Sequence, residues 1–159
     1  MAIEIERKFL VKDLSWKRGI EGQRLRQGYL SLEPARTLRV RVADDWAWLT
    51  IKGVREGLSR LEFEYDIPVA DGIALLEQLC HQPVIDKTRY RVSHDRHVWE
   101  IDEFHGANQG LVVAEIELES ENESFEKPPW LGREVSDDRR YANSSLVQHP
   151  YSQWEKGNG

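Results

Sequence analysis

The stretch Ile3-Glu4-Ile5-Glu6-Arg7-Lys8-Phe9 alternates apolar and charged side chains with little interruption. Successive side chains of a β-strand point to opposite faces, so Glu4, Glu6 and Lys8 share one face and the apolar residues share the other. The stretch therefore predicts a strand with one charged face and one apolar face.

The same period of two recurs along most of the chain and is typical of strands. Turn-forming Gly, Pro and Asp residues separate most of the alternating segments. The predicted strands are residues 3–11, 23–32, 36–44, 46–53, 59–67, 85–95, 97–104 and 111–120.

Two segments predict helices instead. Asp71 can cap a helix that ends before Pro83. Ser136 can cap a second helix that runs to about Gln148, with acidic residues in its first turn. Between them, the Pro-rich residues 128–132 predict a rigid connector.

The spacing of the strands predicts the architecture. Many strands joined by short turns favour an antiparallel meander, and eight strands can close into a barrel without exposed edges. We predict a mainly β fold of the α+β class, an eight-stranded antiparallel closed barrel with helices packed outside. An open sheet with helices on one face is the alternative. In this prediction residues 1–149 form a single domain and residues 150–159 form a polar C-terminal tail.

The charged faces of the predicted strands are nearly pure. An ordinary amphipathic sheet with its charges in water is one interpretation. The other is a barrel turned inside out, whose charged faces line a tunnel and whose apolar faces lie under helices. Burying unpaired charges is costly, so such a lining indicates a ligand that uses it. The faces contain Lys8, Arg39, Arg41, Lys52, Arg60, Lys87, Arg89 and Arg91, and Glu4, Glu6, Glu62, Glu64, Asp66, Glu100, Asp102, Glu115, Glu117 and Glu119.

The mixture of signs narrows the class of ligand. A cavity lined by Arg and Lys suits a polyanion, above all phosphates. Carboxylates beside those bases would repel the anion unless they hold divalent cations, and Mg²⁺ binds through carboxylates together with substrate phosphate oxygens. A tunnel of this kind therefore predicts a metal–polyphosphate site.

The overall composition excludes several other classes of protein. The 159 residues include 22 Lys and Arg against 28 Asp and Glu, which argues against nucleic acid as a partner. No apolar run of about 18 residues predicts a membrane span, and the N-terminal residues do not resemble a signal peptide. The single cysteine, Cys80, fits a reducing compartment. We expect a cytoplasmic protein, and a homodimer that pairs through an outer face is one possibility.

The charged motifs also carry a resemblance as an ordered set. They are Glu4-x-Glu6-x-Lys8, Arg39-x-Arg41, Lys52, Glu62-x-Glu64, Lys87-Thr88-Arg89, Glu100-x-Asp102 and Glu115-x-Glu117. From residue 4 to about 146 the chain resembles the CYTH superfamily, the triphosphate tunnel metalloenzymes. Residues 26–30, 128–130 and 140–143 further resemble the short bacterial members, several of which are similar to inorganic triphosphatases.

The resemblance implies a role for each matching residue. The metal-binding acids would be Glu4, Glu6, Glu115 and Glu117. The phosphate-binding bases would be Lys8, Arg39, Arg41, Lys52, Lys87 and Arg89. Tyr29 matches a tyrosine that is thought to act with the motif lysine, so the implied catalytic residues are Lys8 and Tyr29.

The implied reaction is hydrolysis of inorganic triphosphate to pyrophosphate and phosphate with Mg²⁺ or Mn²⁺. The same tunnel could serve thiamine triphosphate, nucleoside triphosphates or ATP cyclisation by an adenylate cyclase, since all present the same triphosphate. A non-catalytic module that binds polyphosphate or nucleotides is an alternative of another class. The complete set of acids argues against it, because a pure binder could use bases alone.

The resemblance leaves the roles of some charged residues undecided. A basic residue near the C-terminus contacts substrate in some relatives, and both Arg139 and Arg140 are candidates. The others are Arg60, Glu62, Glu64, Glu100 and Asp102.

Overall fold

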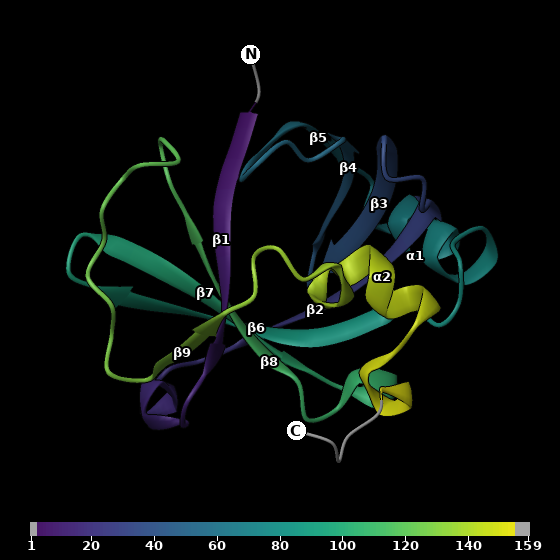
Figure 1. Ribbon diagram of the computed structural model, residues 1–159. Coiled ribbons are helices and arrows are strands. Elements are labelled where there is room, and N and C mark those ends of the chain that lie inside the picture. The colour runs from purple at the N-terminus through teal and green to yellow at the C-terminus, as the bar shows by residue number, and fades with distance from the viewer. Residues whose placement is uncertain (1–2, 155–159) are drawn as a thin grey trace.

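Antiparallel strands form the framework of residues 3–154, which the computed structural model describes (Figure 1). The strands are β1 (Ile3–Val11), β2 (Gln23–Ser31), β3 (Arg36–Ala43), β4 (Trp46–Gly53), β5 (Ser59–Ile67), β6 (Ile85–His94), β7 (His97–Phe104), β8 (Val112–Glu117) and β9 (Leu131–Glu134). The α-helices are α1 (Val69–Gln78) and α2 (Asn143–Gln148). The eight predicted strands are confirmed.

The first eight strands close into a barrel. Hydrogen bonding runs in the order β1-β5-β4-β3-β2-β6-β7-β8 and returns to β1. The pairing between β1 and β5 is short and joins Ile3 to Leu61 and Ile5 to Ser59. Farther along, the same edge of β1 pairs with β9, which lies outside the barrel. The closed barrel is therefore confirmed, and the open-sheet alternative is wrong.

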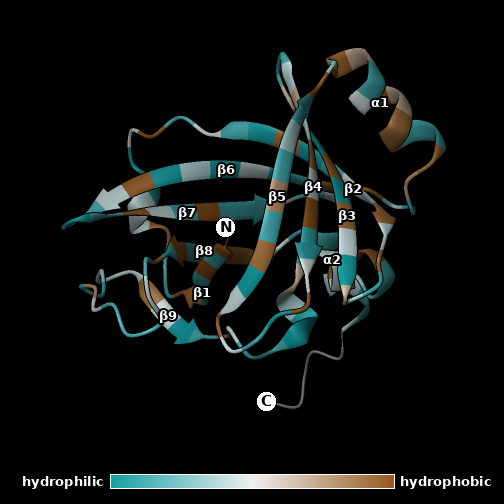
Figure 2. Cartoon of the chain, turned by 90° about the horizontal axis from the view of Figure 1, so that it is seen from above, coloured by the Kyte–Doolittle hydropathy of each residue, from teal (hydrophilic) through white to brown (hydrophobic). Residues whose placement is uncertain are grey.

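Alternation along the strands gives the barrel a polar inner face and an apolar outer face, and it appears as bands of opposite hydropathy along the strands in Figure 2. Part of the outer face lies under α1, where Leu76 packs against Val42 and Ala47. Gly72 permits this close approach, because a Cβ atom there would lie 2.8 Å from the Ala47 Cβ. A second apolar cluster around Trp99 covers the outer face of β7 and β8. The elements outside the barrel thus bury the apolar faces of β3, β7 and β8, whereas that of β5 stays exposed.

The C-terminal segment packs against inward-facing side chains at one end of the barrel. Leu146 of α2 and Tyr141 pack in one cluster with Tyr29, Phe104 and Val113. Phe104 and Val113 are in phase with the charged inner residues of β7 and β8, and Tyr29 is in phase with Gln27 of β2. α1 therefore packs outside as predicted, whereas α2 packs against inward-facing side chains at one end of the barrel.

The predicted helix ends need correction. α1 begins at Val69 after Pro68, so Asp71 lies in the first turn and is not the cap. The first half of the predicted helix from Ser136 to Gln148 is wrong, because Asp138 instead caps a 3-10 turn, Arg139–Tyr141. A regular helix begins only at Asn143, the first residue of α2, where Leu146 and Val147 are buried.

Two strand ends also differ from prediction. The predicted connector at residues 128–132 contains the start of β9, which uses the free edge of β1. β8 ends at Glu117, so the exposed Glu119 lies beyond the strand and outside the inner face.

Part of the predicted tail packs on the domain. The Tyr151 amide donates to Asn108 Oδ1 at 2.8 Å, and the Trp154 ring lies 5.0 Å from that of Tyr141. Residues 155–159 lie outside the described residues. Within residues 3–154 no helix is long and apolar enough to cross a membrane. The outer face of β5 exposes Leu61 and Phe63, and the homodimer stays a prediction.

Candidate active site

The strand register places the charged stripes on the inner face of the barrel. Glu6 lies opposite Glu117 and Lys8 opposite Glu115 across the β1–β8 pairing. Arg39 lies opposite Tyr29 across the β2–β3 pairing. Alternation then puts the other predicted site residues in phase with these, on β4 and β6. One surface therefore collects residues from six predicted strands, β1, β2, β3, β4, β6 and β8.

Lys87 and Arg89 share one buried carboxylate. The Lys87 ammonium lies 2.8 Å from Asp102 Oδ2, and Arg89 donates to both carboxylate oxygens at 2.8 and 2.9 Å. Burial alone would raise the pKa of Asp102, but Arg89 and Lys87 lower it well below its usual range. Burial lowers the pKa of Lys87 to about 7 although Asp102 opposes the shift. Arg89 also pairs with Glu100 at 3.4 Å, whereas Asp102 is the only carboxylate within residues 3–154 that forms an ion pair with Lys87. The lowered pKa of Lys87 therefore marks a surplus of positive charge at this residue.

Two arginines of β3 add to this surplus. Arg39 donates to Thr50 Oγ1 at 3.0 Å, while its buried Nε has no hydrogen-bond partner. Arg41 donates from Nε to Gln27 Oε1 at 2.9 Å. Burial, Arg39 and Arg89 together lower the pKa of Arg41 to about 9. Arg39 also lies 3.6 Å from Glu64 Oε2, whereas no carboxylate within residues 3–154 pairs with Arg41. A buried guanidinium without a carboxylate partner is costly, and an anionic ligand would supply Arg41 with the missing acceptor.

The opposite part of the inner face, on β1 and β8, has surplus negative charge. Burial, Glu115 and Glu4 raise the pKa of Glu6 to about 8. Burial and the neighbouring carboxylates, with Glu4 first, also raise the pKa of Glu117. For Glu115 burial acts in the same direction, but nearby cations led by Lys8 lower its pKa to about 2. The local bases therefore compensate the charge of Glu115, whereas they do not offset burial and carboxylate repulsion at Glu6 and Glu117.

The carboxylates offer the oxygen donors that Mg²⁺ and Mn²⁺ prefer. Within residues 3–154, however, no three acidic, His or Cys side chains converge on one point as ligands would. The reason is visible at Glu4, whose carboxylate accepts from Lys52 Nζ at 2.9 and 3.2 Å. The donor set fits a divalent cation chemically, and Glu4 would have to exchange Lys52 for it.

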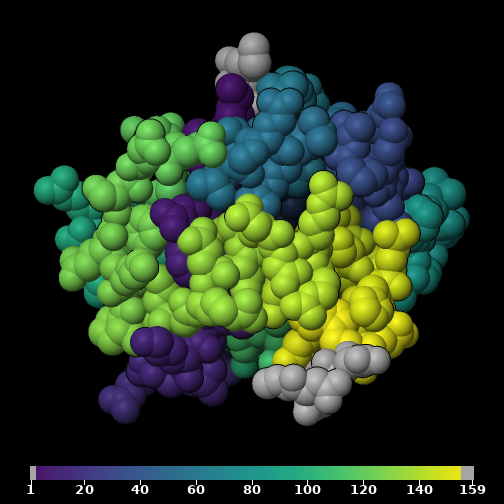
Figure 3. Space-filling model, in the orientation of Figure 1, coloured from purple at the N-terminus to yellow at the C-terminus, as the bar shows by residue number. Residues whose placement is uncertain are grey.

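A cavity of about 370 Å³ opens where β1 leaves β5. Glu4, Glu6 and Lys8 line its inner side, and Arg55 and Arg60 line the side of the β4–β5 hairpin. In Figure 3 the lime-green segment before α2 crosses the front of the molecule beneath the blue β4–β5 hairpin. The cavity gives small molecules a route to the inner face.

The two arginines near the C-terminus differ in position. Arg139 lines the cavity. Arg140 is held elsewhere, because it pairs with Asp138 at 2.7 Å and its guanidinium lies 4.8 Å from the centre of the Trp154 ring. The structure therefore favours Arg139 over Arg140 as the basic residue of this segment that faces the site.

The predicted catalytic residues do not contact each other. Lys8 Nζ donates to the Tyr141 carbonyl at 3.3 Å and lies 3.9 Å from Glu115. Tyr29 is buried in the apolar cluster that closes the barrel end. A joint role of Lys8 and Tyr29 stays a prediction.

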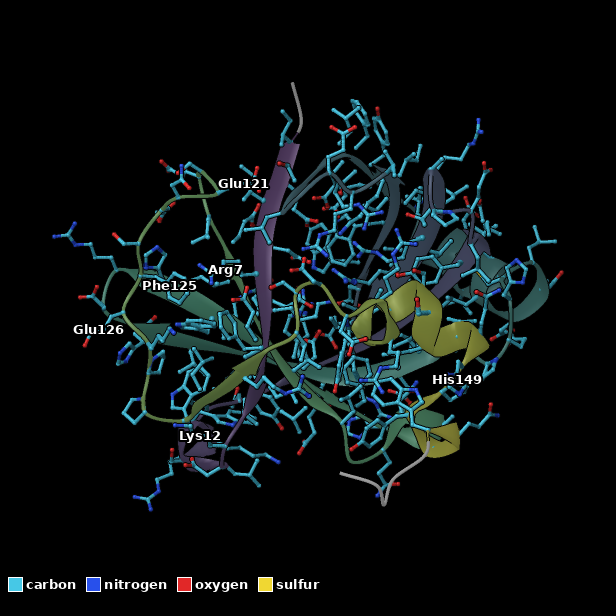
Figure 4. The ribbon with its side chains drawn as sticks, in the orientation of Figure 1. Arg7, Lys12, Glu121, Phe125, Glu126 and His149 are labelled. Carbon is cyan, nitrogen blue, oxygen red and sulfur yellow. The ribbon has the colours of Figure 1, made fainter. Side chains whose placement is uncertain are left out.

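Charged residues of the opposite phase lie outside the site, as the alternation predicts for Arg24. Arg24 forms an exposed ion pair with Asp86 at 2.5 Å. Arg7 pairs with Glu134 of β9 and lies against Phe125, which Figure 4 labels beside it. These bases support the outer surface, where they cannot reach an anion inside the barrel.

Comparison with known proteins agrees with this geometry. The model of the CYTH domain matches residues 2–151. The chain belongs to the CYTH family. The resemblance inferred from the charged motifs is thereby confirmed.

Two relatives of this CYTH protein carry the name inorganic triphosphatase. One, from Acetivibrio thermocellus, is 49% identical over 98% of this chain and 100% of its own length. The other, from Nitrosomonas europaea, is 37% identical over 91% of this chain and 96% of its own length. A crystal structure described as an inorganic triphosphatase superposes with a TM-score of 0.65, at 33% identity over 90% of this chain and 96% of that one.

Three polar residues of the CYTH barrel touch the predicted bases and were assigned no role from the sequence. Gln27 and Thr50 are fully buried on the inner face, and Asn143 reaches it from α2. The phase of Gln27 with Tyr29 could have revealed the first. Nothing in the local pattern around Asn143 indicates that its side chain reaches Lys87.

Proposed function

We propose that this CYTH protein hydrolyses inorganic triphosphate to pyrophosphate and phosphate. The observation that carries the proposal is the opposition of surplus positive charge on β3 and β6 to surplus negative charge on β1 and β8, within one closed barrel. A polyphosphate fits the first surplus and a divalent cation fits the second. The names of the two full-length relatives support the same substrate.

The bases of the inner face would bind the phosphate chain. Arg39 and Arg41 present guanidinium groups, whose planar donors match phosphate oxygens. Lys87 adds a buried ammonium, and Arg89 and Lys52 extend the row of cations on both sides of the barrel. Donors fixed before the reaction stabilise the charge that develops on the phosphoryl oxygens in the transition state. Each of these bases is therefore expected to contribute to the rate of hydrolysis as well as to substrate binding.

The acids would hold the metal. Glu4, Glu6, Glu115 and Glu117 supply its ligands in this proposal, with Mg²⁺ or Mn²⁺ as the ion. Such an ion neutralises phosphate charge and lowers the pKa of a bound water. On this chain's side, Lys52 would leave Glu4 and turn to the phosphate, since its ammonium now occupies the carboxylate that the cation needs.

Lys8 and Tyr29 are the proposed groups for the attacking water. Lys8 sits at the edge of the cavity with only 14% of its side chain exposed. Its ammonium can orient a water or a terminal phosphate oxygen, and a phenol such as Tyr29 can take part in the same hydrogen-bond chain. The water oxygen forms a bond to the terminal phosphorus while the bridging P–O bond breaks. One proton of the water stays on the phosphate that forms, and the other passes to the pyrophosphate that leaves.

The cavity supports a small substrate. Its lining is charged and lacks a broad aromatic surface on which a nucleobase could stack. The buried free Cys80 is compatible with the reducing cytoplasm, where we place the protein. The proposed partner is therefore a small-molecule triphosphate and not a nucleic acid.

The test is phosphate release from tripolyphosphate by the purified chain, with Mg²⁺ or Mn²⁺ and then with excess EDTA. We expect turnover with metal and loss of turnover with EDTA that added metal restores. Thiamine triphosphate, ATP and GTP should give a lower kcat/KM, and ATP should yield no cyclic AMP. Tight binding of tripolyphosphate without turnover would instead identify a binding module and overturn the proposal.

A further inference from the structure

A chain of hydrogen bonds links two of the proposed phosphate-binding residues through neutral amides. Arg41 Nε donates to Gln27 Oε1 at 2.9 Å, and Gln27 Nε2 donates to Asn143 Oδ1 at 3.1 Å. The same Asn143 oxygen accepts from Lys87 Nζ at 3.0 Å. Side chains from β2 and β6 therefore meet at Asn143 of α2, and Gln27 extends the chain of hydrogen bonds to Arg41 of β3.

We infer that Gln27 and Asn143 are positioning residues that hold Arg41 and Lys87 in register for one phosphate chain, an inference that rests on the proposed function. Lys87 has three N–H donors. Asp102 and Asn143 each accept one, at 2.8 and 3.0 Å. Two fixed bonds aim the remaining donor, which is then the one that a phosphate oxygen can accept.

Arg41 is positioned in a corresponding way. Its Nε is held by Gln27, which is fully buried and cannot move away into solvent. Its terminal nitrogens have no hydrogen-bond partner among residues 3–154 and stay free for an anion. The amide thus fixes the guanidinium plane without using the fork that recognises phosphate.

The neutrality of the two amides is essential to this role. A carboxylate at either position would bind the same donors, but it would compensate the positive charge that attracts the substrate. An amide oxygen accepts the hydrogen bonds and leaves the charge intact. Asp102 already supplies the one carboxylate that keeps Lys87 and Arg89 together.

Asn143 also connects the site to the closure of the barrel. It is the first residue of α2, and Leu146 and Val147 of that helix are buried in the cluster that closes the barrel end. Packing of α2 on the barrel end therefore also brings Asn143 into position to accept a hydrogen bond from Lys87. The C-terminal segment contributes to the site through this contact in addition to its packing.

The first experiment compares Asn143→Ala with Asn108→Ala. Both asparagines join the C-terminal segment to the barrel, but Asn108 accepts from the Tyr151 amide and does not touch the proposed bases. We expect Asn143→Ala to lower kcat for tripolyphosphate about 10- to 100-fold, as a misplacement of about 1 Å can. Asn108→Ala should lower the Tm and keep the wild-type kcat. Equal kcat values for the two variants would overturn the inference.

A double variant separates positioning from simple loss of structure. If Asn143 acts through Lys87, its removal should have little further effect on the rate once Lys87 has been replaced by Ala. Independent, multiplicative losses in the Lys87→Ala background would contradict the inference. Because wild-type turnover is measured beside each variant, absence of wild-type activity would identify failure of the proposed function, whereas unaltered variants of an active enzyme would identify failure of the inference.

Asn143→Asp keeps the inference falsifiable if Asn143→Ala does not fold. The carboxylate can still accept from Lys87, so the Tm should be retained. Its negative charge beside the phosphate site should raise the KM for tripolyphosphate about 10-fold or more. An unchanged KM in this folded variant would show that the neutrality of the amide is irrelevant and would overturn the inference.

Discussion

The two halves of the inner face differ in the sign of the charge that the protein leaves uncompensated. On β3 and β6 burial lowers the pKa of Arg41 to about 9 and that of Lys87 to about 7. On β1 and β8 burial and neighbouring acids raise the pKa of Glu6 to about 8. The charged form is thus disfavoured at Arg41 and Lys87 in the first half and at Glu6 in the second. This difference in charge is what supports the proposal of a polyanion beside a divalent cation.

The largest expected effect comes from removing one of the proposed phosphate-binding bases on β3 and β6. Arg39→Ala should reduce kcat/KM for tripolyphosphate about 10²- to 10³-fold, because one fixed donor to the transition state is lost. The measurement is phosphate release at saturating metal. Arg24→Ala is the matched control, since Arg24 lies outside the barrel in an exposed ion pair. Equal losses in both variants would show that the inner face is not special.

Substitutions of the acidic residues on β1 and β8 should change the metal requirement of the enzyme. Glu6→Gln is expected to raise the Mg²⁺ or Mn²⁺ concentration needed for half-maximal activity by at least about 10-fold, since a ligand charge is lost. Glu103→Gln, which alters an outward-facing ion pair with Lys17, should leave that concentration unchanged. If Glu6→Gln reduced the rate without changing the metal requirement, the assignment of this half to the cation would be wrong.

The lowered pKa of Lys87 predicts a pH dependence. Only the protonated ammonium attracts phosphate, so kcat/KM should fall about 10-fold per pH unit once the pH rises above about 7. Lys87→Arg keeps a charge at these pH values and should lack this fall, although its absolute rate will be lower. An identical alkaline limb in the wild type and in Lys87→Arg would assign the pH dependence to another group.

The smallest expected effect concerns Arg139, which the C-terminal segment contributes to the lining of the cavity. Arg139→Ala should raise the KM for tripolyphosphate a few-fold, because Arg139 lines the cavity through which the anion enters. Arg140→Ala should not change the KM, since Arg140 is paired with Asp138. The effect of Arg139→Ala should also shrink at high salt, where long-range attraction is screened.

The sequence predicted the strands and the faces well because both depend on local alternation. Arg39 and Arg41 could be assigned to one face, and Arg24 to the other, without knowledge of any distant contact. Helix ends were less predictable. Ser136 looks like an N-cap, but its hydroxyl accepts from the Lys8 amide across the barrel edge, a long-range bond that no local pattern contains.

The sequence by itself determined that charges of both signs lie on one face of successive strands, because the period of a strand assigns every side chain to a face. The tertiary structure alone decided which charges meet. Pairing of β1 with β8 brought Glu6 opposite Glu117, and packing of α2 placed Asn143 against Lys87. Such contacts join residues that are far apart in the chain, so they follow from register and closure and not from alternation.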